Sequence, residues 1–124
     1  MNLSIGIDWA DQSHAICVRE REARRILAEF EMAHTAAGVC QLEEAVKALD
    51  CIPEACVVAI ETNQGTLVNY LFESGYRVHP IPPAAVKAYR DRHRRTGAKS
   101  NADDAQLLSD ILCQDLELFP VGAT

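Results

Sequence analysis

The chain has 124 residues, which is enough for one domain with its own core but short for a complete multi-step DNA enzyme. Hydrophobic residues make up 48% of it and charged residues 24%, and no apolar run approaches the roughly 20 residues of a membrane helix, so we expect no membrane association. Because the N-terminus MNLSIGIDW also lacks the basic region and cleavage site of a signal peptide, we expect a cytoplasmic protein.

Three short strands are predicted first. Residues 3–10 alternate apolar positions with small or polar ones, and two further runs of apolar residues follow at 14–19 and 25–31. Alternation with a period of two is typical of strands that bury one face, and the short spacing between the runs favours a meander.

The spacing of the apolar residues changes after Thr35, which is the predicted N-cap of a helix. Apolar residues then recur at spacings of three and four, which places them on one face of a helix that ends before Pro53; they are Val39, Leu42, Val46 and Leu49. Residues 55–60, ACVVAI, form a continuous apolar run, as expected for a strand that is buried on both faces.

The remaining elements alternate between helix and strand. ETNQG predicts a turn, and a helix through residues 67–72 ends at Gly75. A short strand lies in YRVHPIPP, a short helix covers 84–89, the segment up to Lys99 is loop-like, and a final helix covers 101–113. The resulting order, βββ-α-β-α-β-α-α, predicts a single α/β domain over residues 1–124 whose sheet mixes antiparallel and parallel pairs.

Cysteine and histidine give no sign of a zinc site or a disulfide framework. The five cysteines are odd in number, and none is spaced as C-x-x-C; the four histidines are equally dispersed. We therefore interpret the cysteines as buried free thiols.

Carboxylates stand where sites form in α/β sheets. Asp8 comes at the end of the first strand and Glu61 directly after the buried run, and strand ends open into a crevice at the sheet edge. A third acid, Asp104, lies in the first turn of the last helix, where Asn101 shares its side and Asp103 points about 100° away. Asp103 also suits a helix cap, and either strand-end acid also suits a turn.

If Asp8, Glu61 and Asp104 converge, their repulsion requires a cation. Oxygen ligands without cysteine or paired histidine select Mg²⁺ or Mn²⁺. Such an ion activates water or a hydroxyl and stabilises charge on a phosphate.

Positive charge gathers just before the last helix, although the whole chain carries −6. Half of the twelve lysines and arginines fall between residues 87 and 99; they are Lys87, Arg90, Arg92, Arg94, Arg95 and Lys99. Such a segment is either a solvated loop or a contact surface for the phosphates of a nucleic acid.

Four segments taken in order carry a resemblance to a known family. GIDWADQSHAICV, VVAIETNQG, PAAVKAY and GAKSNADDAQLLSDIL resemble the landmarks of the DEDD-type insertion-sequence transposases, the group that includes the Piv DNA invertases. Their N-terminal domain is similar to the RuvC Holliday-junction resolvase, which has an RNase H-like fold.

The resemblance implies a catalytic domain for DNA cleavage and rejoining. It implies that Asp8, Glu61, Asn101 and Asp104 are the four catalytic positions and that Mg²⁺ or Mn²⁺ is the cofactor. It further implies DNA as substrate, a structured guide RNA as a second partner, a homo-oligomer in the full-length protein, and a C-terminal domain with a serine nucleophile beyond this N-terminal fragment.

The sequence departs from the family pattern at three places. Asn101 stands where the pattern Lys-Thr-Asp-x-x-Asp-Ala has its first aspartate. Either Asp103 compensates, or the metal site is impaired, or the change was introduced; the sequence leaves these open. In the loops, Gly65 follows Glu61 at a greater distance than usual, and Pro82-Pro83 replaces Asn-Pro.

Two other functions remain as alternatives. Asn101 favours an inactive relative that keeps the fold as a nucleic-acid-binding module. GIDWADQS also resembles the first phosphate loop of sugar kinases and actin-like ATPases, although those proteins need a longer chain with a second glycine-rich loop.

Overall fold

The computed structural model describes residues 1–9, 13–61, 65–92 and 101–122, with residues 101 and 102 described by their backbone only. One sheet of five strands, in the order β3-β2-β1-β4-β5, crosses the molecule. The strands are β1 (Leu3–Asp8), β2 (Ser13–Glu20), β3 (Arg25–Ala33), β4 (Cys56–Ile60) and β5 (Arg77–Pro80). β1, β2 and β3 form an antiparallel meander, whereas β1, β4 and β5 run parallel, so the predicted mixed sheet is confirmed.

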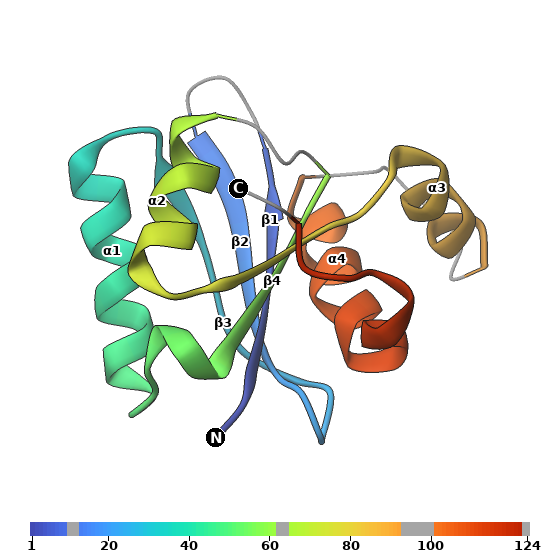
Figure 1. Cartoon of the computed structure of the whole chain (residues 1–124), viewed down its shortest axis with the longest axis horizontal. Coiled ribbons are helices and arrows are strands. Elements are labelled where there is room, and N and C mark those ends of the chain that lie inside the picture. Colours follow the sequence, from blue (N-terminus) through green and yellow to red (C-terminus); the bar gives the residue numbers. More distant parts are fainter. Residues whose placement is uncertain (10–12, 62–64, 93–100, 123–124) are drawn as a thin grey trace.

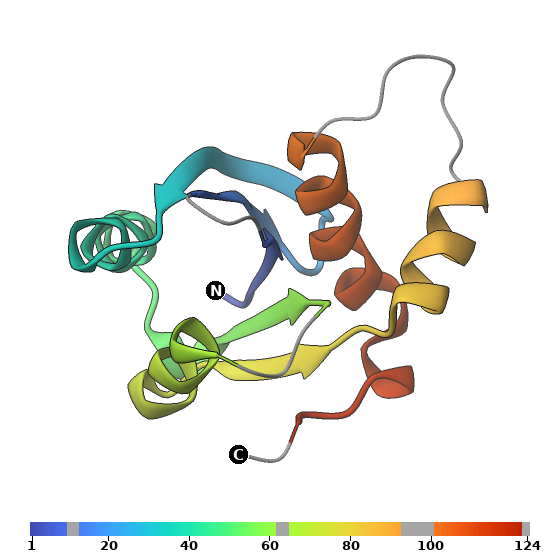
Figure 2. The ribbon, with the colours of Figure 1, turned by 90° about the horizontal axis from the view of Figure 1, so that it is seen from above.

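Helices cover both faces of the sheet (Figures 1 and 2). α1 (Ala36–Ala48) and α2 (Thr66–Ser74) lie on one face, and α4 (Asn101–Asp115) lies on the other, with α3 (Pro83–Arg92) outside it. Two short 3₁₀ turns, η1 (Pro53–Ala55) and η2 (Leu116–Leu118), complete the chain. The predicted order of strands and α-helices is confirmed.

The helix ends follow local chemistry. The Thr35 side chain accepts a hydrogen bond from the backbone N–H of Gly38, which satisfies one of the unpaired donors at the start of α1. Gly75 ends α2 in the left-handed conformation that glycine adopts at little cost. Both ends were predicted from the sequence.

The prediction for α3 was wrong at its C-terminal end. The helix was expected to stop at residue 89, but it continues to Arg92. Tyr89 donates a hydrogen bond to the Asp115 carboxylate, and Arg90 donates one to Asp104. These contacts hold the last turn of α3 against α4, so tertiary packing extends the helix beyond its sequence signal.

Strand alternation divides the core between the two faces. From β1, Leu3, Ile5 and Ile7 are buried in the larger cluster beneath α1 and α2. Ser4 and Gly6 point to the opposite face, where the Ser4 hydroxyl donates to the carbonyl oxygen of Ser109 in α4 at 2.6 Å. The neighbouring core cluster on that face joins β4 to α3 and α4, and it includes Val57, Ala59, Leu108 and Ile111.

The expectation of buried cysteines holds only in part. Cys17, Cys51 and Cys56 are buried free thiols, but Cys40 is exposed and Cys113 is half-buried. Cys40 lies on the solvent side of α1, where the helical period leaves no core contact. Within the described residues, no helix is both long and apolar enough to span a membrane.

A polar clamp fastens the β2–β3 hairpin to α4. The Arg19 guanidinium donates to the Ser109 hydroxyl at 3.0 Å, to the Gln106 carbonyl at 3.2 Å and to the Arg24 carbonyl at 2.8 Å. The Arg24 guanidinium in turn makes a bidentate ion pair with Asp110, donating one hydrogen bond to each carboxylate oxygen at 2.8 Å. Two hydrogen bonds from the half-buried Arg19 guanidinium, together with the Arg24–Asp110 contact, tie the outer strands to the helix that carries Asp104.

Replacing Arg19 by methionine is expected to lower the free energy of unfolding by about 1–3 kcal/mol, because the buried Ser109 hydroxyl and the carbonyls lose a charged donor. Arg25→Met is the matched control, since the Arg25 side chain is 69% exposed and meets Glu20 only at 3.4 Å. We expect its loss to stay below about 0.5 kcal/mol. Urea denaturation measures the free energy of unfolding of both variants, and equal losses would contradict the role of Arg19 in fastening the hairpin to α4.

Candidate metal and nucleic-acid site

Two acids meet at one edge of the sheet. β1 and β4 are parallel, and their register pairs Ile7 with Ile60. Asp8 and Glu61 are the next residues of the two chains, so they stand side by side where the strands end. By alternation both side chains belong to the face covered by α4. Asp8 is half-buried and Glu61 is exposed.

The third acid lies on the helix that covers this edge. Asp104, in the first turn of α4, is only 8% exposed, whereas its neighbour Asp103 is exposed. The next residue, Ala105, packs against β1: a Cβ placed on Gly6 would lie 2.1 Å from the Ala105 carbonyl oxygen. Glycine at position 6 therefore lets the start of α4 approach β1, two residues before Asp8.

Arg90 forms an ion pair with Asp104. Its guanidinium lies 3.1 Å from the Asp104 carboxylate, and the side chains are 35% and 11% exposed. The Arg90 Nε is buried and has no hydrogen-bond partner among the described residues. Arg90 was predicted to contact phosphate; in this structure it neutralises an acid of the candidate site. Sequence reasoning missed this pair, since no spacing signal connects two different helices.

Asp8, Glu61 and Asp104 belong to the same edge of the sheet, but they do not form a ready metal-binding group. Among the described residues, no three His, Cys, Asp or Glu side chains are grouped closely enough to hold a metal ion. The backbone of α4 places Asn101 one turn before Asp104, on the same side of the helix. Carboxylate oxygens nevertheless remain the donors that Mg²⁺ and Mn²⁺ prefer, so the donor set fits such an ion.

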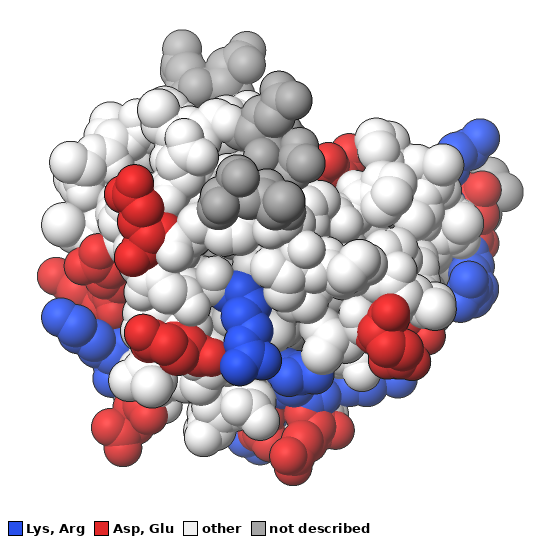
Figure 3. Space-filling model, viewed as in Figure 1, with Lys and Arg blue, Asp and Glu red and all other residues white. Residues whose placement is uncertain are grey.

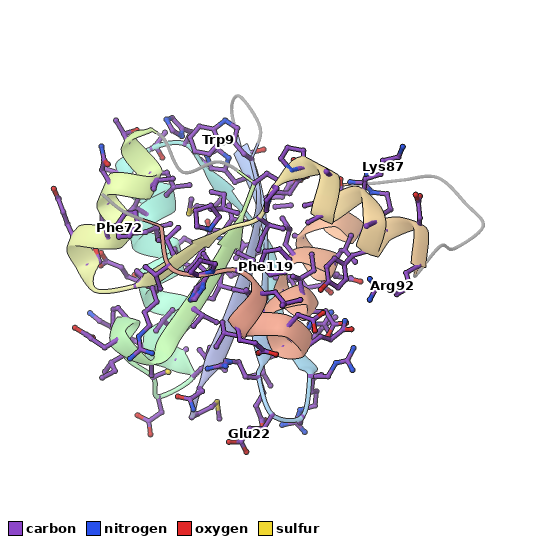
Figure 4. The ribbon with its side chains drawn as sticks, turned by 45° about the vertical axis from the view of Figure 1, so that its right-hand side comes forward. Trp9, Glu22, Phe72, Lys87, Arg92 and Phe119 are labelled. Carbon is purple, nitrogen blue, oxygen red and sulfur yellow. The ribbon has the colours of Figure 1, made fainter. Side chains whose placement is uncertain are left out.

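Of the predicted phosphate-binding residues, the structure describes three. Lys87 and Arg92 extend from α3 into solvent (Figure 4), and the Arg92 guanidinium lies 4.6 Å from the centre of the Tyr89 ring. Arg94, Arg95 and Lys99 lie outside the described residues. On the face in Figure 3, basic side chains alternate with acidic ones along the lower edge and do not form a continuous patch.

An aromatic cluster at the same edge was not predicted. The Trp9 ring lies 4.5 Å from the His14 ring and 5.4 Å from the His34 ring, measured between centroids. His14 Nε2 and His34 Nδ1 are 3.0 Å apart. The two histidines are twenty positions apart in the sequence, and only the antiparallel register of β2 and β3 brings them together.

Buried histidines are expected to make the protein less stable in weak acid. Burial, and secondarily the charge of His34, lowers the pKa of His14. Burial also lowers the pKa of His79; its hydrogen bond to the Phe119 carbonyl opposes this shift, and the charges of Arg21 and Arg77 add to it. Below the ordinary histidine value of about 6.5 the unfolded chain binds more protons than the folded one. The contribution of these two histidines to the free energy of unfolding is therefore fully present above that pH and is lost as the pH falls below it.

The measurement is the free energy of unfolding in urea between pH 7.5 and 5.5. Each histidine contributes a slope of at most about 1.4 kcal/mol per pH unit. His14→Gln should reduce the slope, whatever it does to the absolute stability. A slope that His14→Gln and His79→Gln together leave unchanged would refute the assignment.

Known proteins resemble this chain in sequence and in fold. The family model of the DEDD transposases of IS110 type, described as "Transposase", matches residues 5–123. The chain is 31% identical over 116 residues to y4uE of Sinorhizobium fredii (strain NBRC 101917 / NGR234), which is named as a transposase. It is 34% identical over 112 residues to the protein of Streptomyces coelicolor (strain ATCC BAA-471 / A3(2) / M145) named as the mini-circle transposase for IS117.

These alignments include 92% and 90% of this chain but only 32% and 27% of the two relatives, so the chain spans about a third of their length or less. Among solved structures, RuvC of T. thermophilus, in complex with a Holliday junction, superposes with a TM-score of 0.64 over 98% of this chain and 100% of that one, at 14% identity. The fold is therefore RuvC-like, that is, RNase H-like. With a family model that matches nearly all of its residues, the chain belongs to the DEDD transposase family of IS110 type.

Proposed function

We propose that this chain is the metal-dependent catalytic domain of a DNA transposase. The proposal is carried by one observation: the β1–β4 register puts Asp8 and Glu61 at the sheet edge that α4 covers with Asp104. Three acids from separate segments of a RuvC-like fold suit phosphoryl transfer on DNA. In a protein of the relatives' length, residues 1–124 would act as one RuvC-like unit of a larger enzyme.

Asp8, Glu61 and Asp104 would hold Mg²⁺ or Mn²⁺, with Asn101 adding its carbonyl oxygen. Once bound, the ion would activate the attacking oxygen and stabilise negative charge on the phosphate. The protein's own groups orient the site: Gly6 admits α4 to β1, and the Arg90 contact holds the Asp104 side chain. When the ion binds, Arg90 must either release the Asp104 carboxylate or share it with the ion.

Charge around α3 supports a role in binding the DNA backbone. Lys87 and Arg92 are exposed on the helix that packs beside the acidic edge, and the sequence continues with Arg94, Arg95 and Lys99. Such side chains contact phosphates without reading bases. We extend the proposal to a cytoplasmic enzyme that works as a homo-oligomer with a guide RNA, as the family resemblance implies.

A non-catalytic nucleic-acid-binding module is the second candidate, because Asn101 removes one negative charge and Arg90 already neutralises Asp104. Metal binding separates the two functions. At ten times its Kd, Mn²⁺ should stabilise the folded chain by about 1.4 kcal/mol and raise the melting temperature by about 5 °C. An inactive module predicts no shift.

Asn101→Asp should restore the missing charge and enlarge the Mn²⁺-dependent shift at a fixed metal concentration. Asn69→Asp, on the exposed surface of α2, is the matched control and should leave that shift unchanged. Differential scanning fluorimetry with and without Mn²⁺ measures both. If neither the original chain nor Asn101→Asp responds to millimolar Mn²⁺, the catalytic proposal fails.

A further inference from the structure

A pocket opens beside the acidic edge, on the opposite face of the sheet. It has a volume of about 290 Å³ and lies where β3 ends and where α1 and α2 begin. Its lining includes His34, Thr35, Thr66 and Tyr70, together with apolar side chains from the same elements. Among the described residues that line it, none is an acid, a lysine or an arginine, so this lining suits a flat and uncharged group better than a phosphate.

Trp9 connects this pocket with the acidic edge. It follows Asp8 directly, and Figure 4 shows it at the end of the sheet. Its ring makes an edge-type contact with the ring of His34, which lines the pocket, with the centroids 5.4 Å apart. A Cβ placed on Gly65 would lie 3.5 Å from Trp9 Cη2, and Gly65 immediately precedes α2. The indole therefore lies close both to a residue of the pocket lining and to the start of α2.

Trp9 leaves part of its ring accessible to solvent. It is the single tryptophan of the chain and remains 37% exposed, although two histidine rings pack against it. Aromatic side chains that stay accessible beside a nucleic-acid backbone are the usual stacking platforms for unpaired bases. The His34 imidazole and the threonine hydroxyls at the pocket add hydrogen-bonding groups that can read a base edge.

We propose that the surface formed by Trp9, His34 and the adjoining pocket binds one unpaired nucleobase of a nucleic-acid strand. The base stacks on the accessible part of the indole and points its edge toward the starts of α1 and α2. Because Asp8 precedes Trp9, this base belongs to a nucleotide next to the phosphate that the acids would act on. The inference rests on the proposed function and assigns it a preference for unpaired strands near the reacting phosphate.

Tryptophan fluorescence tests the inference without metal. The chain, in EDTA, is titrated with a single strand of twelve deoxythymidines, with a twelve-unit abasic strand that has the same phosphates but no bases, and with a twelve-base-pair duplex. Because Trp9 is the one tryptophan, quenching reports directly on its surroundings. We expect saturable quenching by the thymidine strand and little by the other two. Equal quenching by the abasic strand would overturn the inference.

Variants complete the test through the anisotropy of a labelled thymidine strand. Trp9→Leu should raise its Kd about 5–100-fold, whereas Trp9→Phe should keep most of the affinity. Leu118→Ser is the control, since Leu118 is also exposed but lies in η2. His34→Ala should weaken binding as well, which keeps the test open if Trp9→Leu unfolds. Unchanged affinity in Trp9→Leu and His34→Ala contradicts the base site.

The same assay separates this inference from the proposed function. Its results are compared with the Mn²⁺ titration of the original chain, because the strand assay itself contains no metal. If the chain binds Mn²⁺ but no strand up to millimolar concentration, the base site is wrong and the metal centre stands. If the strand quenches Trp9 but Mn²⁺ does not bind, the catalytic proposal is wrong and the surface is that of a binding module.

Discussion

Under the proposed function, replacing Asp104 by asparagine is expected to reduce metal-dependent DNA strand cleavage, by a transposase that contains this chain, about 100-fold or more. The substitution keeps the size of the side chain but removes one of the negative charges that would hold the ion. A gel assay of cleavage on the element's own ends, with Mg²⁺ present, measures the loss. Asp103→Asn is the matched control, because Asp103 lies on the same helical turn but is exposed. We expect its rate to change less than about threefold.

Loss of the ion pair must be separated from loss of the carboxylate. Asp104→Asn and Arg90→Gln both remove the ion pair between α3 and α4, but only the first removes an acid of the site. Both variants should therefore lose similar stability, while Asp104→Asn should lose far more cleavage. Equal cleavage in Asp103→Asn and Asp104→Asn would exclude Asp104 from the metal site.

The second large effect is expected from Gly6→Ala. A Cβ at this position would lie 2.1 Å from the Ala105 carbonyl oxygen and 2.6 Å from the Ser109 amide nitrogen, both backbone atoms of α4. Since the helix backbone has no rotamer to change, α4 must move away from β1, at a cost of about 3 kcal/mol in unfolding free energy. The displaced helix also carries Asp104 away from Asp8, so the Mn²⁺-dependent shift should disappear.

Gly122→Ala is the matched control for this substitution. A Cβ there would meet the ring of Pro80 at 2.8 Å, and the Gly122 N–H donates to the Val78 carbonyl oxygen at 2.9 Å, so the crowding falls on β5 and not on the contact between α4 and β1. We expect a smaller loss of stability than in Gly6→Ala and an unchanged Mn²⁺ response. If urea denaturation shows that Gly6→Ala is as stable as the original chain, then α4 does not pack against β1 as described.

The sequence predicted the elements whose signals are local. The spacing of Leu42 and Val46 marked the buried face of α1, the run before Glu61 marked a strand buried on both faces, and both acids at strand ends were recognised. The parallel pairing that joins β1 to β4 followed from no local signal. That pairing is what places Asp8 beside Glu61.

The remaining features depend on contacts between distant residues. Arg90 meets Asp104 across two helices, and the Arg19 clamp joins β2 to α4 through residues about ninety positions away. Periodicity and composition carry no information about such pairs. Gly6 lies within a strand pattern, yet only the approach of α4 explains why no side chain fits there.

The central claim is that Asp8, Glu61 and Asp104 share one divalent ion at the edge of the sheet. Crystals of this chain soaked in Mn²⁺ test it most directly, because the anomalous signal of manganese locates the ion without reference to the protein chemistry. We expect a peak with carboxylate oxygens of all three acids at roughly 2.0–2.3 Å. A manganese peak elsewhere, or a peak at this edge that the Asp104 carboxylate does not contact at saturating Mn²⁺, would contradict the claim.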